Sequence, residues 1–197
     1  MRIGLIADTH MPGSIEALWP QAYDAFSEVD AILHAGDLHT LDVVDELSQL
    51  APTYVARGNG DHGIVDQRLR DCWVLELGGL TVGMIHKFPS PERKPPEFIE
   101  GYMARHFGEV KPDVLVYGHT HLEGLYRVGE MVCVNPGSPT LPKNQSIRHG
   151  TIGILDILPK SSTVSILQIT EEGVKAHDSL QPHSCLLYTS PSPRDRG

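Results

Sequence analysis

The chain has 197 residues, 40% hydrophobic and 21% charged, and its 25 acidic and 16 basic side chains give a net charge of −9. This length and balance predict one globular domain and exclude a disordered or collagen-like chain. The acidic excess excludes a broad surface for nucleic acid, because such a surface needs a basic face. No apolar stretch approaches the ~20 residues that cross a bilayer, so we expect no membrane span. The three cysteines have no metal-ligand spacing, and their odd number is a poor disulfide framework, which favours a reducing compartment. We therefore expect a cytoplasmic protein without a membrane partner.

The first part of the chain alternates short apolar runs with helical periodicity, which is typical of an α/β fold. Ser14 and Thr40 stand where helix N-caps are expected. The predicted elements are strands over 2–7, 30–35 and 53–56, with helices over 14–26 and 40–50 between them.

The second part is richer in strands. Gly78-Gly79 lies between two apolar runs and signals a hairpin. The predicted elements are strands over 72–77 and 80–85, a helix over 95–108, a buried strand over 114–117, and strands of antiparallel character over 124–128, 132–134, 151–157 and 164–169. Together they predict two packed mixed β-sheets flanked by α-helices.

From Cys185 the periodic pattern stops and the sequence becomes rich in proline and serine. This segment resembles the translation of an adapter used in sequencing libraries; the alternative is a native Pro/Ser-rich tail. We therefore expect a single domain over 1–184 and a disordered tail over 185–197 without a catalytic role.

Five segments place acidic, histidine or asparagine side chains directly after a predicted strand, where α/β folds collect their ligands. Residues two apart in an extended chain point the same way, so Asp8 with His10, and His119 with His121, can each offer two ligands to one cavity. Nitrogen and oxygen ligands without thiolate suit Mn, Fe, Zn or Ni. The segments are Asp8-Thr9-His10, Gly36-Asp37, Gly58-Asn59, His86 and Gly118-His119-Thr120-His121.

The order Asp-x-His, Gly-Asp, Gly-Asn-x-Asp, His, Gly-His-x-His resembles the calcineurin-type metallophosphoesterase superfamily. Its most similar branch contains small bacterial and archaeal phosphodiesterases that share their fold with the retromer subunit Vps29. The resemblance extends from Arg2 to about Thr170 and includes Val134-Asn135-Pro136-Gly137-Ser138. It implies a four-layer sandwich that hydrolyses a small phosphoester, most simply a phosphodiester, with a hydroxide held between two divalent ions.

The resemblance also implies a ligand set. Manganese is the first choice for both ions, and iron, zinc or nickel are the alternatives. Asp37, Asn59 and His119 are the implied catalytic residues. The implied ligands are Asp8, His10 and His121 for the first ion, Asn59, His86 and His119 for the second, and Asp37 between them.

Two other functions use the same fold: a protein-docking scaffold of the Vps29 type and a phosphomonoesterase. A scaffold can lose ligands without penalty, whereas all seven are present here, so the sequence favours an enzyme. The pocket shape that separates diesters from monoesters is not visible in the sequence, which also leaves a homo-oligomer open.

Several neighbouring side chains are candidates for supporting the ligands. His39 either supports them or begins the next helix, and Asp61 and His62 either tune Asn59 or belong to a turn held by an Asx-type hydrogen bond. Asn135 is expected to brace its loop.

The sequence departs from the family pattern in two places. Lys87 and Phe88 follow His86, where many relatives have glycine and often a second histidine, and Gly60 follows Asn59, where larger relatives have a histidine. The first departure concerns the geometry of the second metal site, whereas the second is common among the small phosphodiesterases of this branch.

Overall fold

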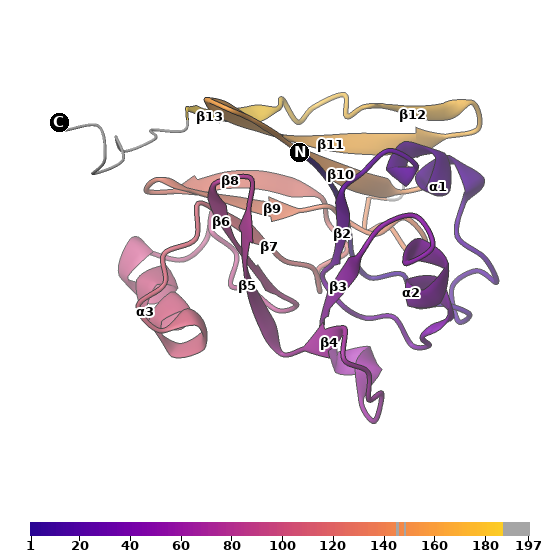
Figure 1. Ribbon diagram of the computed structural model, residues 1–197, viewed down its shortest axis with the longest axis horizontal. Coiled ribbons are helices and arrows are strands. Elements are labelled where there is room, and N and C mark those ends of the chain that lie inside the picture. Colours follow the sequence, from indigo (N-terminus) through magenta and orange to yellow (C-terminus); the bar gives the residue numbers. More distant parts are fainter. Residues whose placement is uncertain (145, 148, 187–197) are drawn as a thin grey trace, which may run out of the picture.

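The computed structural model describes residues 1–144, 146–147 and 149–186 (Figure 1). Its helices are α1 (Pro20–Phe26), α2 (Asp42–Leu47) and α3 (Pro96–Phe107), with a short 3₁₀ helix η1 (Asn59–Asp61). Its strands are β1 (Arg2–Ile6), β2 (Ala31–His34), β3 (Thr53–Ala56), β4 (Leu69–Arg70), β5 (Cys72–Leu77), β6 (Leu80–Ile85), β7 (Val114–Val116), β8 (Gly124–Val128), β9 (Met131–Asn135), β10 (Thr151–Leu158), β11 (Ser161–Thr170), β12 (Gly173–Ala176) and β13 (His183–Leu186).

The strands form two mixed sheets. The first has the order β12-β11-β10-β1-β2-β3-β4, with β13 also paired to β11, and the second has the order β5-β6-β7-β9-β8. Strands β1 to β4 run parallel in the first sheet, as do β6, β7 and β9 in the second. The prediction of antiparallel character for 132–134 is therefore only half right, because β9 is antiparallel to β8 but parallel to β7.

Helices cover the outer face of each sheet, with α1 and α2 on the first and α3 on the second (Figure 1). Strand β1 is buried on both sides: Ile3 and Leu5 belong to the core between the sheets, and Ile6 to the core under α1 and α2. This double burial explains its nearly continuous apolar sequence. The predicted fold of two packed mixed sheets flanked by helices is confirmed.

The first two helices are shorter than predicted. Helix α1 begins at Pro20, not Ser14, because proline fits the first turn but disfavours helical backbone before it. Ser14 instead donates its hydroxyl to the carbonyl of Thr9. Helix α2 covers Asp42–Leu47 rather than 40–50, and Thr40 is not its N-cap. By contrast, α3 ends at Gly108 as predicted.

The chain continues in the first sheet beyond the expected boundary at Ser184. Strand β13 pairs Cys185 with Ser162 and Leu186 with Ser161 of β11, and this backbone pairing does not require apolar periodicity. The rest of the expected tail, 187–197, lies outside the described residues. Among the described residues, no helix is long and apolar enough to cross a membrane.

Gly4 in β1 offers a test of how tightly the first sheet packs on α1. A Cβ atom at Gly4 would lie 2.8 Å from two ring carbons of Phe26, whose side chain is fully buried. We expect Gly4→Ala to lower the free energy of unfolding by about 1–3 kcal/mol, because the ring has no free space to move into. Urea unfolding measures this change.

Gly101 in α3 provides the matched control. A Cβ there meets no atom within 4 Å outside its own helix, and the residue is exposed. Gly101→Ala should stabilise the protein by up to about 1 kcal/mol through helix propensity. Equal effects of the two substitutions would contradict the packing described for β1.

Candidate metal centre

The seven predicted ligand residues lie together where the carboxyl ends of the parallel strands of both sheets meet. They form two groups of potential ligands, Asp8 with His10 and His121, and Asp37 with His86 and His119. Within each group the ligand atoms lie within 4.8 Å of one another. Asn59 adjoins the second group, with its Oδ1 2.9 Å from His119 Nδ1.

Asp37 lies between the two groups. Its Oδ2 is 3.5 Å from His10 Nε2 on one side and 3.5 Å from His86 Nε2 on the other. Its Oδ1 accepts a hydrogen bond of 2.7 Å from the N–H of Gly60. One oxygen is thus held by the backbone, while the other faces both groups equally.

Backbone carbonyls fix the tautomers of two histidines. His86 Nδ1 lies 2.7 Å from the carbonyl of Ala35, and His121 Nδ1 lies 2.9 Å from that of Leu141. Because a carbonyl can only accept, each neutral ring carries its proton on Nδ1 and directs the lone pair of Nε2 into the cluster.

These lone pairs face other electron-rich atoms. His121 Nε2 is 3.0 Å from His10 Nε2, and His86 Nε2 is 3.2 Å from Asn59 Oδ1. At these distances each contact needs a proton or a metal ion between its two atoms, because two lone pairs would repel. The donor set therefore fits divalent transition metals that prefer nitrogen and oxygen.

The electrostatics of the cluster lead to the same conclusion. Burial and the nearby Asp37 carboxylate raise the pKa of Asp8 well above its usual value. Burial and neighbouring histidines lower the pKa values of His10 and His119, so both rings are neutral at neutral pH. The histidines can therefore act as ligands, but they do not supply the positive charge that two buried carboxylates need.

The backbone around the ligands is left-handed rather than extended. Among the described residues, positive φ angles outside glycine occur at Asp8, His10, Asp37, His39, His119 and His121, with values of 47° to 76°. Each such residue costs about 1 kcal/mol or more, and such strain collects at functional sites. The extended geometry expected for these segments is wrong, and His119 and His121 contribute to different groups as a result.

Glycines allow the segments to approach closely. A Cβ at Gly58 would lie 2.1 Å from Asp37 Oδ1, and a Cβ at Gly118 would lie 2.8 Å from Asp8 Oδ2. Any larger residue at either position would push a carboxylate out of the cluster.

Asp61 organises the turns that carry Asp37 and Asn59. Its buried carboxylate accepts hydrogen bonds from the N–H groups of Asp37, Leu38, His39 and Gly58, at 2.9, 2.7, 3.2 and 2.7 Å. Burial alone would raise its pKa, but these N–H groups outweigh burial and hold the pKa below its usual value.

The other supporting candidates differ in position. His39 Nε2 lies 2.9 Å from His10 Nδ1, and the two rings meet edge to face. Asn135 donates to the carbonyl of Gly118 and the hydroxyl of Thr120, and so braces the loop that carries His119 and His121. His62 is exposed and makes no hydrogen bond within the described ranges.

The structure also reveals supports that the sequence analysis did not assign. Ser138 donates its hydroxyl to the carbonyl of Asp8, and Thr140 donates to that of Thr9. His34, which is buried in β2, lies with Nε2 3.1 Å from the Thr9 hydroxyl. Nothing in their spacing links these residues to the first ligand turn.

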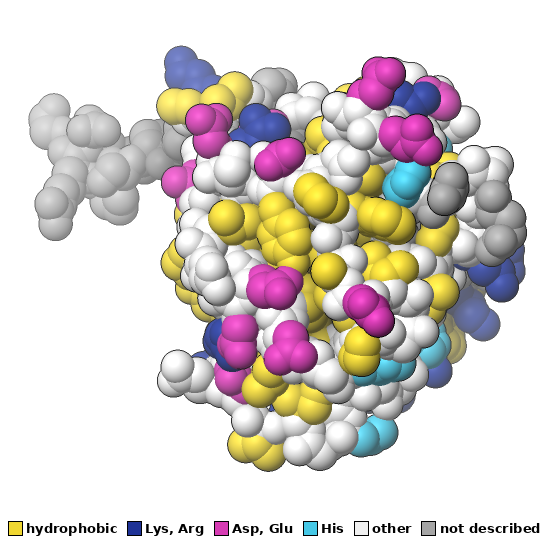
Figure 2. All heavy atoms as spheres, turned by 90° about the vertical axis from the view of Figure 1, so that its right-hand side faces the viewer, with side chains coloured by type: hydrophobic (Ala, Val, Ile, Leu, Met, Phe, Trp, Pro, Cys, Tyr) yellow, Lys and Arg dark blue, Asp and Glu magenta, His cyan; other side chains and the backbone are white. Residues whose placement is uncertain are grey.

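The molecular face that carries α1 and α2 has hydrophobic side chains at its centre and acidic side chains around them (Figure 2). Histidine side chains reach the surface toward one edge of this face. The cluster is therefore not sealed, since His10, His119 and His121 are only partly buried. A small anion has access to these side chains.

Comparisons with known proteins agree with this geometry. The profile of the calcineurin-like phosphoesterase superfamily domain matches residues 1–160. A probable metallophosphoesterase from Methanothermobacter thermautotrophicus is 39% identical over 146 residues, which cover 73% of this chain and 80% of that protein. A phosphodiesterase from Methanocaldococcus jannaschii is 26% identical over 179 residues, covering 85% and 100%. The solved structure of Chaetomium thermophilum Vps29 superposes with a TM-score of 0.75 at 20% identity, covering 98% of each chain.

Asp61→Asn tests whether this carboxylate holds the ligand turns. An amide retains one acceptor oxygen and turns an N–H₂ group toward backbone donors, so we expect a loss of roughly 2–4 kcal/mol in the free energy of unfolding. Asp24→Asn is the control, because Asp24 is exposed on α1, away from these turns, and should leave the urea midpoint unchanged. An Asp61→Asn protein as stable as wild type would contradict this role.

Proposed function

Because the chain belongs to the calcineurin-like phosphoesterase superfamily, we propose that it is a phosphodiesterase that acts with two divalent metal ions bound in this cluster. The position of Asp37 carries the proposal, since one carboxylate oxygen lies 3.5 Å from a histidine nitrogen of each group. When bound, two such ions supply positive charge for an anionic phosphate and lower the pKa of water. Manganese is our first choice of metal.

We assign the ligands by their place in the two groups. Asp8, His10 and His121 would hold the first ion, and Asn59, His86 and His119 the second, with Asp37 shared. Asp37, Asn59 and His119 surround the middle of the cluster and would act on the substrate. Lys87, which replaces a glycine of many relatives, is exposed and lies close enough to lower the pKa of His119, so it adds positive charge beside the second group.

The preference for diesters rests on relatives named phosphodiesterases, including the one from Methanocaldococcus jannaschii. The similarity to Vps29 concerns the fold alone, and the complete ligand set favours an enzyme over a docking scaffold.

Assays with bis-p-nitrophenyl phosphate, p-nitrophenyl phosphate and cyclic nucleotides after manganese loading test the proposal. Faster hydrolysis of the monoester would replace the diester assignment, and no hydrolysis of any substrate would favour a scaffold.

Metal stoichiometry provides a direct prediction. Elemental analysis after manganese reconstitution should give two ions per chain, because seven nitrogen and oxygen ligands exceed the usual six coordination positions of one ion. Asp37→Ala should reduce activity more than His10→Ala, since it removes a carboxylate that lies 3.5 Å from a histidine of each group and is one of two among the predicted ligands. One ion at saturation, or equal residual activity in the two variants, would be incompatible with the shared position of Asp37.

The contact between His39 and His10 gives a second prediction. His10 Nε2 faces Asp37 and His121, so a metal ion held at Nε2 would leave the proton of the neutral ring on Nδ1, which can donate it to His39 Nε2. We infer that His39 positions His10 by fixing this tautomer. His39→Ala should weaken manganese binding about 10- to 100-fold, as is usual when the partner of a metal-binding histidine is lost.

Isothermal titration with manganese measures this effect without any activity assay. His39→Gln should retain most of the affinity, because its Oε1 can accept the same proton. His62→Ala is the matched control, since His62 is exposed and lies outside the cluster. If His39→Ala bound manganese like wild type, His39 would have no positioning role.

A further inference from the structure

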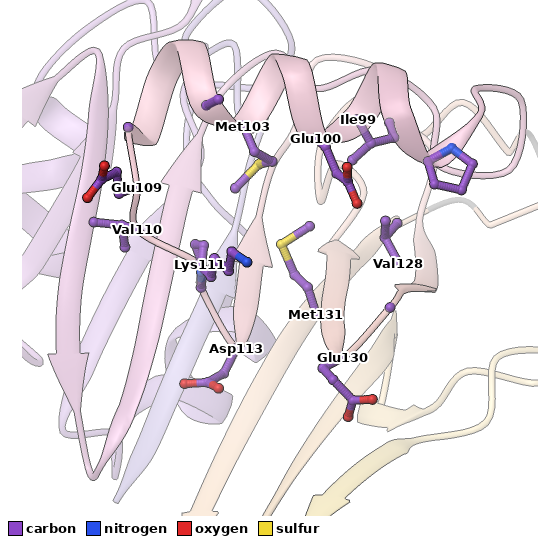
Figure 3. Close-up of a pocket in the computed structure, with 15 residues that line it drawn as sticks. Ile99, Glu100, Met103, Glu109, Val110, Lys111, Asp113, Val128, Glu130 and Met131 are labelled. Carbon is purple, nitrogen blue, oxygen red and sulfur yellow. The ribbon is translucent and has the colours of Figure 1, made fainter.

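A second concave site lies at the other end of the second sheet. A cavity of about 820 Å³ separates α3 from the hairpin of β8 and β9 (Figure 3). Its lining includes 108–113, just before β7, and 128–131 at the hairpin turn. These segments precede β7 and β9, whereas the metal centre follows the carboxyl ends of the strands. The cavity shares no residue with that centre.

The cavity exists because a single helix covers the outer face of this sheet within the described chain. Helix α3 packs Ile99, Met103 and Phe107 against the sheet. The hairpin residues Val128 and Met131 remain only partly buried beside it. The result is an apolar hollow whose size is that of a ligand-binding pocket. Its two methionines can adapt to different apolar side chains.

The rim of the hollow is acidic. Glu100 projects from α3, Glu109 follows its end, and Glu130 lies at the turn of the hairpin on the opposite wall (Figure 3). None of the three side chains makes an ion pair or hydrogen bond with another described residue. Asp113 differs, because its carboxylate accepts the N–H of Thr81. Lys111 is the one cation among the lining residues.

We propose that this hollow is a docking site for a basic, amphipathic peptide segment of a partner protein. Apolar side chains of the segment enter between α3 and the hairpin, and its lysine or arginine side chains pair with Glu100, Glu109 and Glu130. The three carboxylates come from α3, the segment after it and the hairpin turn, so a partner with several positive groups matches them better than one small cation (Figure 3). A second copy of this chain is a poor occupant, because a symmetric contact would bring two acidic rims together.

Fluorescence anisotropy with a fluorescein-labelled KLLKLLK peptide tests the proposal on the whole protein. The triple variant Glu100→Gln, Glu109→Gln, Glu130→Gln should bind about tenfold more weakly, as expected for the loss of three exposed ion pairs. The matched control changes the same amount of charge elsewhere, with Asp24→Asn, Glu28→Gln and Glu172→Gln, which are all exposed. This control should bind the peptide like wild type.

The apolar part of the site has its own variant. Met131→Gln keeps the length of the side chain but removes its apolar surface, and should weaken binding about fivefold. Leu158→Gln, at an exposed leucine of the first sheet, should have no effect. Hydrolysis of phosphodiesters should be unchanged in all these variants, which separates this proposal from the proposed enzymatic function.

Several outcomes would overturn the proposal. Equal weakening by both triple variants would mean that overall negative charge attracts the peptide. Displacement of the peptide by tetrabutylammonium, at concentrations where sodium has no effect, would identify a small organic cation as the occupant. Dimerisation of the protein alone, abolished by Met131→Gln in sedimentation experiments, would identify a second copy.

Discussion

The buried carboxylates of Asp8 and Asp37 repel each other, and much of the surrounding chain serves to hold them together. Both oxygens of Asp8 lie within hydrogen-bond distance of the N–H of His119, at 3.0 and 2.9 Å. Asp8 follows a strand of the first sheet and His119 follows a strand of the second. The same contact that stabilises a negative charge therefore also joins the two sheets at the edge where the cluster lies.

Backbone strain and hydrogen bonding act together at this edge. Left-handed residues reverse the chain sharply after β1, β2 and β7, and each turn is held by a side chain that is not itself a predicted ligand. Asp61 holds the turn after β2, Asn135 the turn after β7, and Ser138 the turn after β1. These supports make the ligand positions a property of the fold before any ion is bound, which is what a preorganised site requires.

Sequence reasoning succeeded where turn residues such as Gly78-Gly79 and Gly129 mark the ends of strands. The strands 53–56, 72–77, 80–85 and 124–128 have the predicted bounds. It failed where one residue overrides a periodic pattern, as Pro20 does in the first helix, and where backbone conformation depends on distant partners, as in the left-handed turns. The candidate ligand residues could be named from the sequence because their order along the chain is distinctive, although the extended geometry first assumed for them was wrong. The role of Asp61 depends on four backbone groups and leaves no periodic signal.

The acidic excess of the chain has different consequences at the two ends of the second sheet. In the candidate metal centre the carboxylates of Asp8 and Asp37 are buried and accept hydrogen bonds from backbone N–H groups. Only a cation small enough to enter the cluster can neutralise their charge. Around the hollow under α3 the carboxylates of Glu100, Glu109 and Glu130 are exposed and have no partner among the described residues, and they lie on different segments around an apolar surface. Charge of this second kind suits a longer partner with several positive groups. Burial, rather than net charge, thus separates the proposed site for metal ions from the proposed surface for a basic peptide.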